Sequence, residues 1–321
     1  MTEFWDQKRV LVTGGNGFLG RVVSHKLIDR GASVIAPRSA QFDLTSPEQT
    51  NQLFHSASPE LVIHLAARVG GIGFNMAEPA SLYLNNLLMG TYVIEAARAH
   101  NVAKTVLVGT VCSYPKFTPV PFAEASLWDG YPEETNAPYG IAKKAMLVHA
   151  QVNRTQYGQR CAFLIPTNLF GPGDKFHPSV SHVIPALIKK CVEAVERGDS
   201  KIEVWGTGRA SREYLYVGDA AEGIVLAAEH YDDPEPVNLG NDHEVTIRET
   251  VERIAELVGF TGDLVWDTSK PDGQPRRRVD PRRAEKTFGW RAGTDFTVGL
   301  RETIDWYRNN RAEAEAAPSY A

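Results

Sequence analysis

Two side chains spaced four residues apart could exchange a proton with a substrate. Tyr139 and Lys143 form a Y-x-x-x-K pattern in NAPYGIAKKA, and this spacing puts both on one face of a helix. The pKa of a free phenol is about 10, so an adjacent ammonium group would stabilise the phenolate near neutral pH. Thr110, which follows an expected strand, could hydrogen-bond the substrate oxygen whose proton Tyr139 handles. The pattern is common on surface helices, but its place downstream of Thr110 favours oxidoreductase chemistry.

A glycine-rich turn near the N-terminus could hold a pyrophosphate. Gly14, Gly17 and Gly20 are spaced G-x-x-G-x-x-G in VLVTGGNGFLG, between an expected strand and an expected helix. Glycines there let the chain turn tightly and bring backbone amides toward negative charge at the start of the helix. Glycines also cluster for steric reasons alone, but their position at the first strand–helix junction predicts a dinucleotide site.

The residue type that follows the second expected strand indicates which dinucleotide is bound. A carboxylate at this point holds the ribose 2′-hydroxyl of NAD, whereas an arginine accommodates the 2′-phosphate of NADP. Arg38 and Ser39 occupy it in VIAPRSAQFDL, with no acidic residue before Asp43. We therefore expect NADP, with Asp43 near the adenine amino group. The alternatives, Arg38 as a solvated loop cation and NAD as the cofactor, stay open.

Short apolar runs alternate with helical patterns in the first half of the chain. Continuous Val, Ile and Leu runs indicate strands covered on both faces, and their alternation with helices indicates a parallel sheet. We expect an α/β fold, with a Rossmann doubly wound parallel sheet and a smaller C-terminal α/β substrate domain. The expected division is 1–170 with 214–240 for the dinucleotide-binding domain and 171–213 with 241–321 for the substrate domain. Expected strands are 8–13, 33–36, 61–66, 105–109, 161–165 and 202–205, and expected helices are 20–30, 82–100, 139–157, 183–196, 220–230 and 246–258.

Composition limits the class of protein. The chain has 321 residues, 43% apolar and 23% charged, with a formal net charge of −5. This usage is typical of globular proteins, and the acidic balance argues against nucleic acid as a partner. No apolar run is long enough for a membrane span or a signal peptide. Cys112, Cys161 and Cys191 are too widely spaced for a disulfide framework or a zinc motif, so we expect no metal and a cytoplasmic location.

Six segments carry a resemblance that covers nearly the whole chain. They are AARVGGIGFN, TVCSYPK, NAPYGIAKK, PTNLFGPGDKFHPSVSHVIPALI, VWGTGRASREYLYV and SKPDGQPRR. Together with the glycine loop they resemble the extended short-chain dehydrogenase/reductase family and, within it, the GDP-L-fucose synthases. The resemblance implies NADPH-dependent 3,5-epimerisation and 4-reduction of GDP-4-keto-6-deoxy-D-mannose to GDP-L-fucose. Each inversion needs one base and one acid beside the ketone. Cys112 and His182 match the family's pair, with His177 as the reserve candidate.

The same resemblance implies roles for residues along the whole chain. Tyr139 would protonate the C4 oxyanion while Lys143 holds the nicotinamide ribose. The residues expected to bind NADP(H) are Gly14, Asn16, Gly17, Phe18, Leu19, Gly20, Arg38, Ser39, Asp43, Leu44, Ala66, Tyr139, Lys143, Pro166, Asn168, Leu169 and His182. The residues expected to bind the GDP-sugar are Asn168, Lys190, Trp205, Arg212 and Asp272. The helices at 82–100 and 139–157 would form a homodimer surface, and the basic run 276–278 is interpreted as a solvated face.

Other functions are consistent with these residues. One is a nucleotide-sugar epimerase without net reduction, as in GDP-mannose 3,5-epimerase, and another is a related GDP-deoxyhexose epimerase/reductase. A catalytically silent nucleotide-sensing protein is a third, although a pure binder needs no acid–base set such as Thr110, Cys112, Tyr139, Lys143 and His182.

Overall fold

Six parallel strands form the central sheet of the computed structural model, which describes residues 4–178, 180–270, 272 and 274–316. In spatial order they are β2 (Ser33–Ile35), β1 (Arg9–Thr13), β3 (Leu61–His64), β4 (Lys104–Val108), β5 (Cys161–Pro166) and β9 (Pro236–Leu239). The order reverses between β1 and β3, and ligands of such sheets bind beyond the carboxyl ends of the strands at this point. The predicted Rossmann fold class is confirmed.

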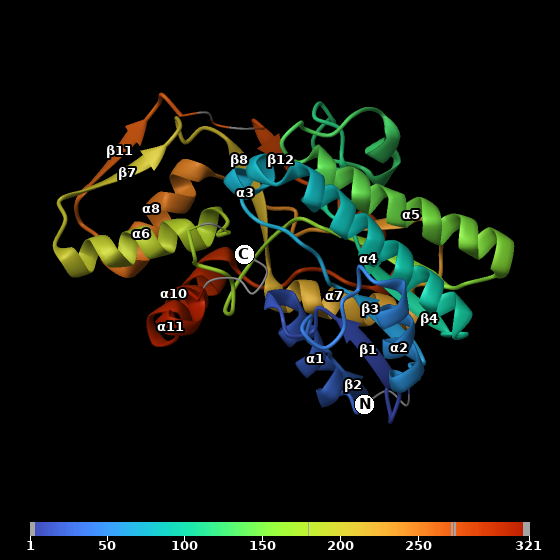
Figure 1. The fold of residues 1–321 in the computed structure, drawn as a ribbon. Helices are drawn as coiled ribbons and strands as arrows, with labels where there is room; N and C mark the ends of the chain where they lie inside the picture. Colours follow the sequence, from blue (N-terminus) through green and yellow to red (C-terminus); the bar gives the residue numbers. More distant parts are fainter. Residues whose placement is uncertain (1–3, 179, 271, 273, 317–321) are drawn as a thin grey trace.

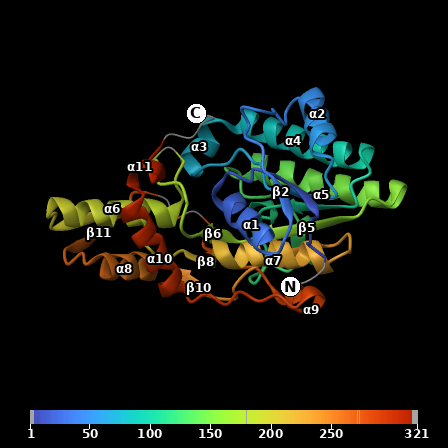
Figure 2. The same ribbon diagram turned by 90° about the horizontal axis from the view of Figure 1, so that it is seen from below.

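Helices cover both faces of this sheet (Figures 1 and 2). One face carries α1 (Phe18–Asp29) and α7 (Val217–His230), and the other carries α2 (Pro47–Ala57), α4 (Pro79–Ala99) and α5 (Ala137–Tyr157). Alternate side chains of each strand point to opposite faces. Val10 and Val12 therefore pack in the core with α1 and α7, whereas Leu11 packs in the core with α2 and α4. Two buried faces explain why the strands are continuous apolar runs.

A second, smaller lobe is built around the long central strand β8. Its elements are β6 (Asn168–Phe170), α6 (Val183–Arg197), β7 (Lys201–Trp205), β8 (Ser211–Tyr216), β10 (Glu244–Thr246), α8 (Ile247–Val258), β11 (Asp263–Asp267), β12 (Arg276–Arg277), α10 (Phe296–Asn309) and α11 (Arg311–Ala314). Strand β8 pairs with β6, β10 and β12, while β7 and β11 form a separate parallel pair. The apolar faces of α6, α8 and α10 close one core against these strands.

The chain passes between the two cores several times. Within β8, Tyr214 packs in the core of the smaller lobe and Leu215 in the core of the sheet. Helix α9 (Arg282–Phe288) also returns to the sheet, where Ala284, Phe288 and Trp290 are buried. These three residues fall in the range predicted for the substrate domain. The domain division itself stays a prediction.

The remaining short elements lie near the carboxyl ends of the strands. They are α3 (Ile72–Ala77) and the 3-10 turns η1 (Val111–Ser113) and η2 (Glu124–Trp128). Every expected strand and helix is present, with ends shifted by a few residues, whereas β8, β9, α2, α9 and α10 are among the elements that were not predicted. Across the described residues, no helix has both the length and the apolar character needed to cross a membrane.

Candidate active site

The glycine loop forms a close-packed turn between β1 and α1. Gly14 has a φ of +71°, which favours glycine. A Cβ on Gly20 would lie 2.1 Å from the Gly14 carbonyl oxygen, and a Cβ on Gly14 would lie 2.7 Å from the amide nitrogen of Ala66. Gly17 is the N-cap of α1 and supplies no side-chain hydrogen bond to its first amides, which leaves them available to an anion. This cradle fits a dinucleotide pyrophosphate.

Most of the other residues expected to bind the cofactor surround this loop. Asn16 is exposed and its Nδ2 donates to the carbonyl oxygen of Ala36 at 2.8 Å. Phe18 lines a cavity of about 170 Å³ together with Asn16 and Gly17. Leu19 and Leu169 are half-buried against the sheet core.

The residues expected at the adenosine end differ in how they are placed. Arg38 and Ser39 are exposed beyond β2. The Asp43 carboxylate accepts hydrogen bonds from the amide and the hydroxyl of Thr45, at 2.8 and 2.7 Å. The side chain of Leu44 is buried under α2, so only its backbone is available to a ligand. Arg38 is exposed to solvent beyond β2, and its role toward a 2′-phosphate therefore stays a prediction.

Thr110 and Cys112 are held directly against the first turn of α5. The amide of Cys112 donates to Thr110 Oγ1 at 3.2 Å, and the Ser113 hydroxyl donates to the Gly140 carbonyl oxygen at 2.9 Å. A Cβ on Gly140 would lie 2.4 Å from the Cys112 carbonyl oxygen. Because Gly140 follows Tyr139, this contact places the loop of Thr110 and Cys112 beside the turn of α5 that carries the phenol, and Cys112 influences the pKa of Tyr139.

Tyr139 and Lys143 lie on one face of α5 as predicted, and both are buried. Lys143 Nζ is 5.9 Å from the centre of the Tyr139 ring. Burial raises the pKa of Tyr139, and the neighbouring Cys112 raises it further. Burial lowers the pKa of Lys143 to about 8. The free site therefore holds a neutral phenol and a lysine that is close to losing its proton.

His64, at the end of β3, is a buried neighbour of Lys143 that the sequence analysis did not single out. Its Nδ1 is 2.7 Å from Thr13 Oγ1, and its Nε2 has no hydrogen-bond partner among the described residues. Burial, followed by the charge of Lys143, lowers the pKa of His64 well below its usual value. An uncharged imidazole thus adds no positive charge beside Lys143.

His182 is the N-cap residue of α6 and is exposed. The protein packed around the imidazole, followed by the charge of Lys175, lowers its pKa. Its neighbour Ser181 contacts the N-terminus of α3, and α3 in turn contacts the N-terminus of α5. A Cβ on Gly71, the N-cap of α3, would lie 2.9 Å from the Ser181 carbonyl oxygen. One turn further along α3, Asn75 Nδ2 donates to Asn136 Oδ1 at 3.1 Å. The loop before His182 therefore packs on the segment that borders the first turn of α5.

The residues expected to bind the nucleotide sugar lie on the smaller lobe. Trp205 is 65% exposed and its ring centre is 5.4 Å from Lys270 Nζ. Lys190 Nζ donates to the Glu203 carbonyl oxygen at 2.8 Å. Arg212 Nη1 donates to two backbone carbonyl oxygens, and burial, followed by the charge of Arg277, lowers the Arg212 pKa to about 10. An aromatic face and two cations suit a nucleoside diphosphate.

Like Lys190 and Arg212, the residues Asp272 and Asn168 make hydrogen bonds within the protein. The Asp272 carboxylate accepts from the Thr207 amide at 2.6 Å and from the Thr207 hydroxyl at 2.7 Å, which fixes the turn after Trp205. Asn168 Nδ2 donates to the carbonyl oxygen of Glu213 at 2.9 Å, so its Oδ1 is the atom left to face a ligand. Pro166, at the end of β5, is buried.

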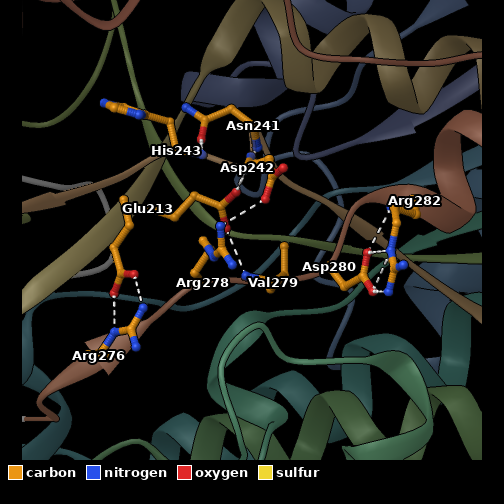
Figure 3. A network of polar contacts seen from close by, with 10 residues as sticks. Glu213, Asn241, Asp242, His243, Arg276, Arg278, Val279, Asp280 and Arg282 are labelled. Carbon is orange, nitrogen blue, oxygen red and sulfur yellow. Dashed lines mark hydrogen bonds and ion pairs between the residues drawn. The ribbon is translucent and has the colours of Figure 1, made fainter.

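The buried carboxylate of Glu213 in β8, which the sequence analysis missed, accepts hydrogen bonds from the segments before β10 and after β12 (Figure 3). Glu213 is fully buried and accepts from the amides of Asn241, Asp242 and Val279, at 2.7, 2.8 and 2.9 Å. Burial raises its pKa to about 7, against the effect of these amides and of Arg278. The local sequence signals Glu213 only by its place beside Arg212 in VWGTGRASREYLYV.

The interpretation of the run 276–278 as a solvated face is wrong for two of its three residues. Arg276 is exposed and pairs with Glu244. Arg278 is half-buried and pairs with Asp242 at 3.0 Å. Arg277 is also half-buried, and its Nη1 lies 3.7 Å from the Cys112 sulfur. Strand geometry turns consecutive side chains to opposite sides, so the middle arginine points toward the site.

Fold and site together define a class: a Rossmann-type oxidoreductase with a tyrosine–lysine pair and a second lobe over the carboxyl ends of the strands. Residues 10–240 match the NAD dependent epimerase/dehydratase family, and the chain belongs to it. The resemblance seen in the sequence is confirmed.

Three relatives narrow the family further. The chain is 40% identical to probable GDP-L-fucose synthase 1 of Oryza sativa subsp. japonica, over 96% of this chain and 94% of that one. It is 36% identical to GDP-L-fucose synthase of Escherichia coli strain K12, over 95% and 98% of the two chains. The structure of a GDP-L-fucose synthetase from Naegleria fowleri bound to NADP matches with a TM-score of 0.87 and 30% identity, over 97% of each chain.

Proposed function

We propose that this protein is an NADPH-dependent enzyme that inverts C3 and C5 of GDP-4-keto-6-deoxy-D-mannose and reduces its C4 ketone, giving GDP-L-fucose. The observation that carries this proposal is the contact of the Thr110–Cys112 loop with the first turn of α5, which puts a thiol beside the tyrosine–lysine pair. Simple reduction needs no thiol at this place. The identities to GDP-L-fucose synthases over nearly the whole chain support the same reaction.

Inversion uses the acidity of the hydrogens next to a ketone. The Cys112 thiolate takes the proton from the ring carbon, and the electron pair moves to the C4 oxygen, where the hydroxyls of Thr110 and Tyr139 donate hydrogen bonds to the enolate. His182 returns a proton to the carbon from the opposite face, which inverts it. The lowered pKa of His182 leaves the imidazole ready to give up a proton once it has been charged.

Reduction follows in the same pocket. Bound NADPH supplies the hydride for C4. Tyr139 gives its proton to the C4 oxyanion, and Lys143 stabilises the phenolate that remains. Both groups are buried, so water does not compete for the proton. The glycine loop and Arg38 hold the pyrophosphate and the 2′-phosphate of NADP(H).

The nucleotide half of the substrate binds the smaller lobe. Trp205 presents an exposed ring to the guanosine, and Lys190 and Arg212 face the diphosphate. Asp272 fixes the turn that follows Trp205. The Asn168 Oδ1 accepts a hydrogen bond from a sugar hydroxyl or from the cofactor.

The test is incubation of the protein with NADPH and GDP-4-keto-6-deoxy-D-mannose. The expected result is one NADPH oxidised for each sugar converted, with the L-fuco configuration of the product seen by NMR. Inverted but unreduced sugar with no NADPH oxidised would instead support an epimerase without net reduction. Unchanged turnover in Tyr139→Phe would contradict the assigned proton donor.

A homodimer is part of the proposal. Tyr83 and Leu84 on α4 and Val148 and Val152 on α5 are large apolar side chains that remain exposed. The adjoining groove of about 490 Å³ is lined by Pro79, Ala80, Tyr83, Tyr131, Ala137, Pro138 and Ile141. A second copy that pairs its own α4 and α5 with these helices would cover the patch. The free Cys112 thiol also favours a reducing compartment such as the cytoplasm.

A further inference from the structure

Of the three consecutive arginines at 276–278, Arg277 is the one whose side chain turns toward the loop that carries Thr110 and Cys112. Its Nη1 lies 3.7 Å from the Cys112 sulfur, and both residues are half-buried. The Cys112 sulfur is thus neither free in solvent nor enclosed by apolar side chains alone, although Cys112 borders the core beneath α5. A guanidinium at this distance attracts a thiolate more strongly than a thiol.

The Arg277 side chain is fixed in place from several directions. Its Nε donates to Gln274 Oε1 at 3.1 Å, and Gln274 Nε2 donates to the Lys116 carbonyl oxygen at 3.0 Å. Strand β12 pairs with β8 so that Arg277 lies opposite Arg212. Two residues further on, the amide of Val279 donates to the Glu213 carboxylate. The guanidinium is therefore aimed at the sulfur by the fold, with little side-chain freedom left to lose.

Arg212 is a second charged residue near the thiol, and it is placed differently. Its Nη1 donates to the carbonyl oxygens of Ser211 and Gln274, both at 2.7 Å. Arg277 contacts the sulfur directly through Nη1. The Tyr139 phenol is another titratable side chain near Cys112, and its pKa is raised, so it adds no negative charge there.

We propose that Arg277 is a positioning residue for Cys112, whose guanidinium holds the thiolate that removes the protons from C3 and C5. This inference rests on the proposed role of Cys112 as the base. As the thiolate takes the proton it becomes a neutral thiol, and the electron pair passes to the C4 oxygen. His182 then protonates the carbon from the opposite face, and loss of the Cys112 proton to solvent restores the thiolate and with it the pair of opposite charges. Arg277 thus supports the inversions and contributes nothing directly to reduction of C4.

The first experiment needs no sugar. The full chain is treated with iodoacetamide, and modification of Cys112 is followed by peptide mass spectrometry. Cys161 and Cys191 are buried, so they serve as internal controls. At pH 7 we expect Arg277→Gln to react about fivefold more slowly than the wild type, because the neighbouring positive charge is lost. Arg277→Lys keeps the charge and should stay within about twofold of the wild type. Arg276→Gln is the matched control and should react as the wild type does.

The pH dependence separates electrostatics from altered access. Near pH 10, above the usual pKa of about 8.5 for a free thiol, a neighbouring positive charge should matter little, so the rates of wild type and Arg277→Gln should converge. Equal slowing at pH 7 and pH 10 would mean that the substitution only blocks the reagent. An unchanged rate at pH 7 would mean that the guanidinium does not hold the thiolate. Either result overturns the inference.

A second experiment distinguishes this inference from the proposed function. Exchange of the C3 and C5 hydrogens is measured by NMR in D₂O with GDP-4-keto-6-deoxy-D-mannose. If Cys112→Ser exchanges at the wild-type rate, Cys112 is not the base, and the proposed function fails even where alkylation depends on Arg277. If Cys112→Ser abolishes exchange but Arg277→Gln leaves it unchanged, Cys112 is the base and the role of Arg277 is refuted. We expect both variants to slow exchange, with Arg277→Lys restoring most of it.

Discussion

Replacing Glu213 by glutamine should change how the stability of the protein depends on pH. The carboxyl group is fully buried, and burial raises its pKa from the usual 4.5 to about 7. The folded protein therefore binds this proton more tightly than the unfolded chain does. The associated stability is fully present below pH 4.5 and is lost as the pH rises through about 7. Glutamine cannot ionise, so Glu213→Gln should not show this loss.

The size of the effect follows from the two pKa values. The interval from 4.5 to about 7, at about 1.4 kcal/mol for each pKa unit, amounts to about 3 kcal/mol. Glutamine also offers one acceptor oxygen where the carboxylate offers two, and an amide left without a partner costs about 1–3 kcal/mol at every pH. The contribution from proton binding varies with pH, whereas the cost of the lost hydrogen bond does not. The change with pH in the difference between the two unfolding free energies therefore reports on ionisation of the Glu213 carboxyl group.

The measurement is urea unfolding of both proteins at a series of pH values from 5 to 8. Other titrating groups are common to the two proteins, so they cancel in the difference between the unfolding free energies. We expect this difference to move by about 3 kcal/mol in favour of Glu213→Gln as the pH rises. Asp242→Asn, in the same network but exposed, serves as the control and should show a much smaller change. A flat difference, or one of opposite sign, would refute the reasoning and show that the three amides outweigh burial.

Four other substitutions test the site and the surface. Cys112→Ser should suppress inversion at C3 and C5, seen as loss of deuterium exchange, while a sugar that needs no inversion is still reduced with oxidation of NADPH. Tyr139→Phe should lower the reduction rate by about 10²–10⁴-fold, the usual contribution of a positioned proton donor, with NADPH binding retained. Gly20→Ala should weaken NADPH binding at least about tenfold by fluorescence titration, because a Cβ there would overlap the Gly14 carbonyl. Val148→Glu should shift the mass measured by light scattering from that of the proposed dimer to that of a monomer; an unchanged dimer mass would exclude α5 from the interface.

Local sequence was sufficient to predict five of the six strands of the central sheet, the glycine loop and the Tyr139–Lys143 pair. Strands buried on both faces are continuous apolar runs, and the spacing of glycines or of a tyrosine and a lysine is itself the geometric requirement. Helix α2 was missed because its sequence, PEQTNQLFHSA, is mostly polar. Its start signals are present, since Ser46 accepts from the Gln49 amide and a proline follows at the first helical position.

The contact of Arg277 with Cys112 could not be read from sequence, because 165 residues separate the two. Three consecutive arginines contain no information about which one turns inward. That choice is made by the register of β12 on β8, where Arg277 lies opposite Arg212, and by the buried carboxylate that holds Val279. Cys112 and His182 are also far apart in the sequence, so their relative placement depends on how the two lobes come together. Their expected position on opposite faces of a sugar ring stays a prediction.

The repeated passage of the chain between its two cores has a consequence for engineering. A chimera that exchanged the sugar-recognising half for that of a relative could not be spliced at one junction, because β8 contributes neighbouring side chains to both cores and α9 returns to the sheet after β12. For the same reason neither half should be obtainable as an autonomous fragment. Altered substrate choice would have to come from substitutions at single positions in the loops that face the sugar.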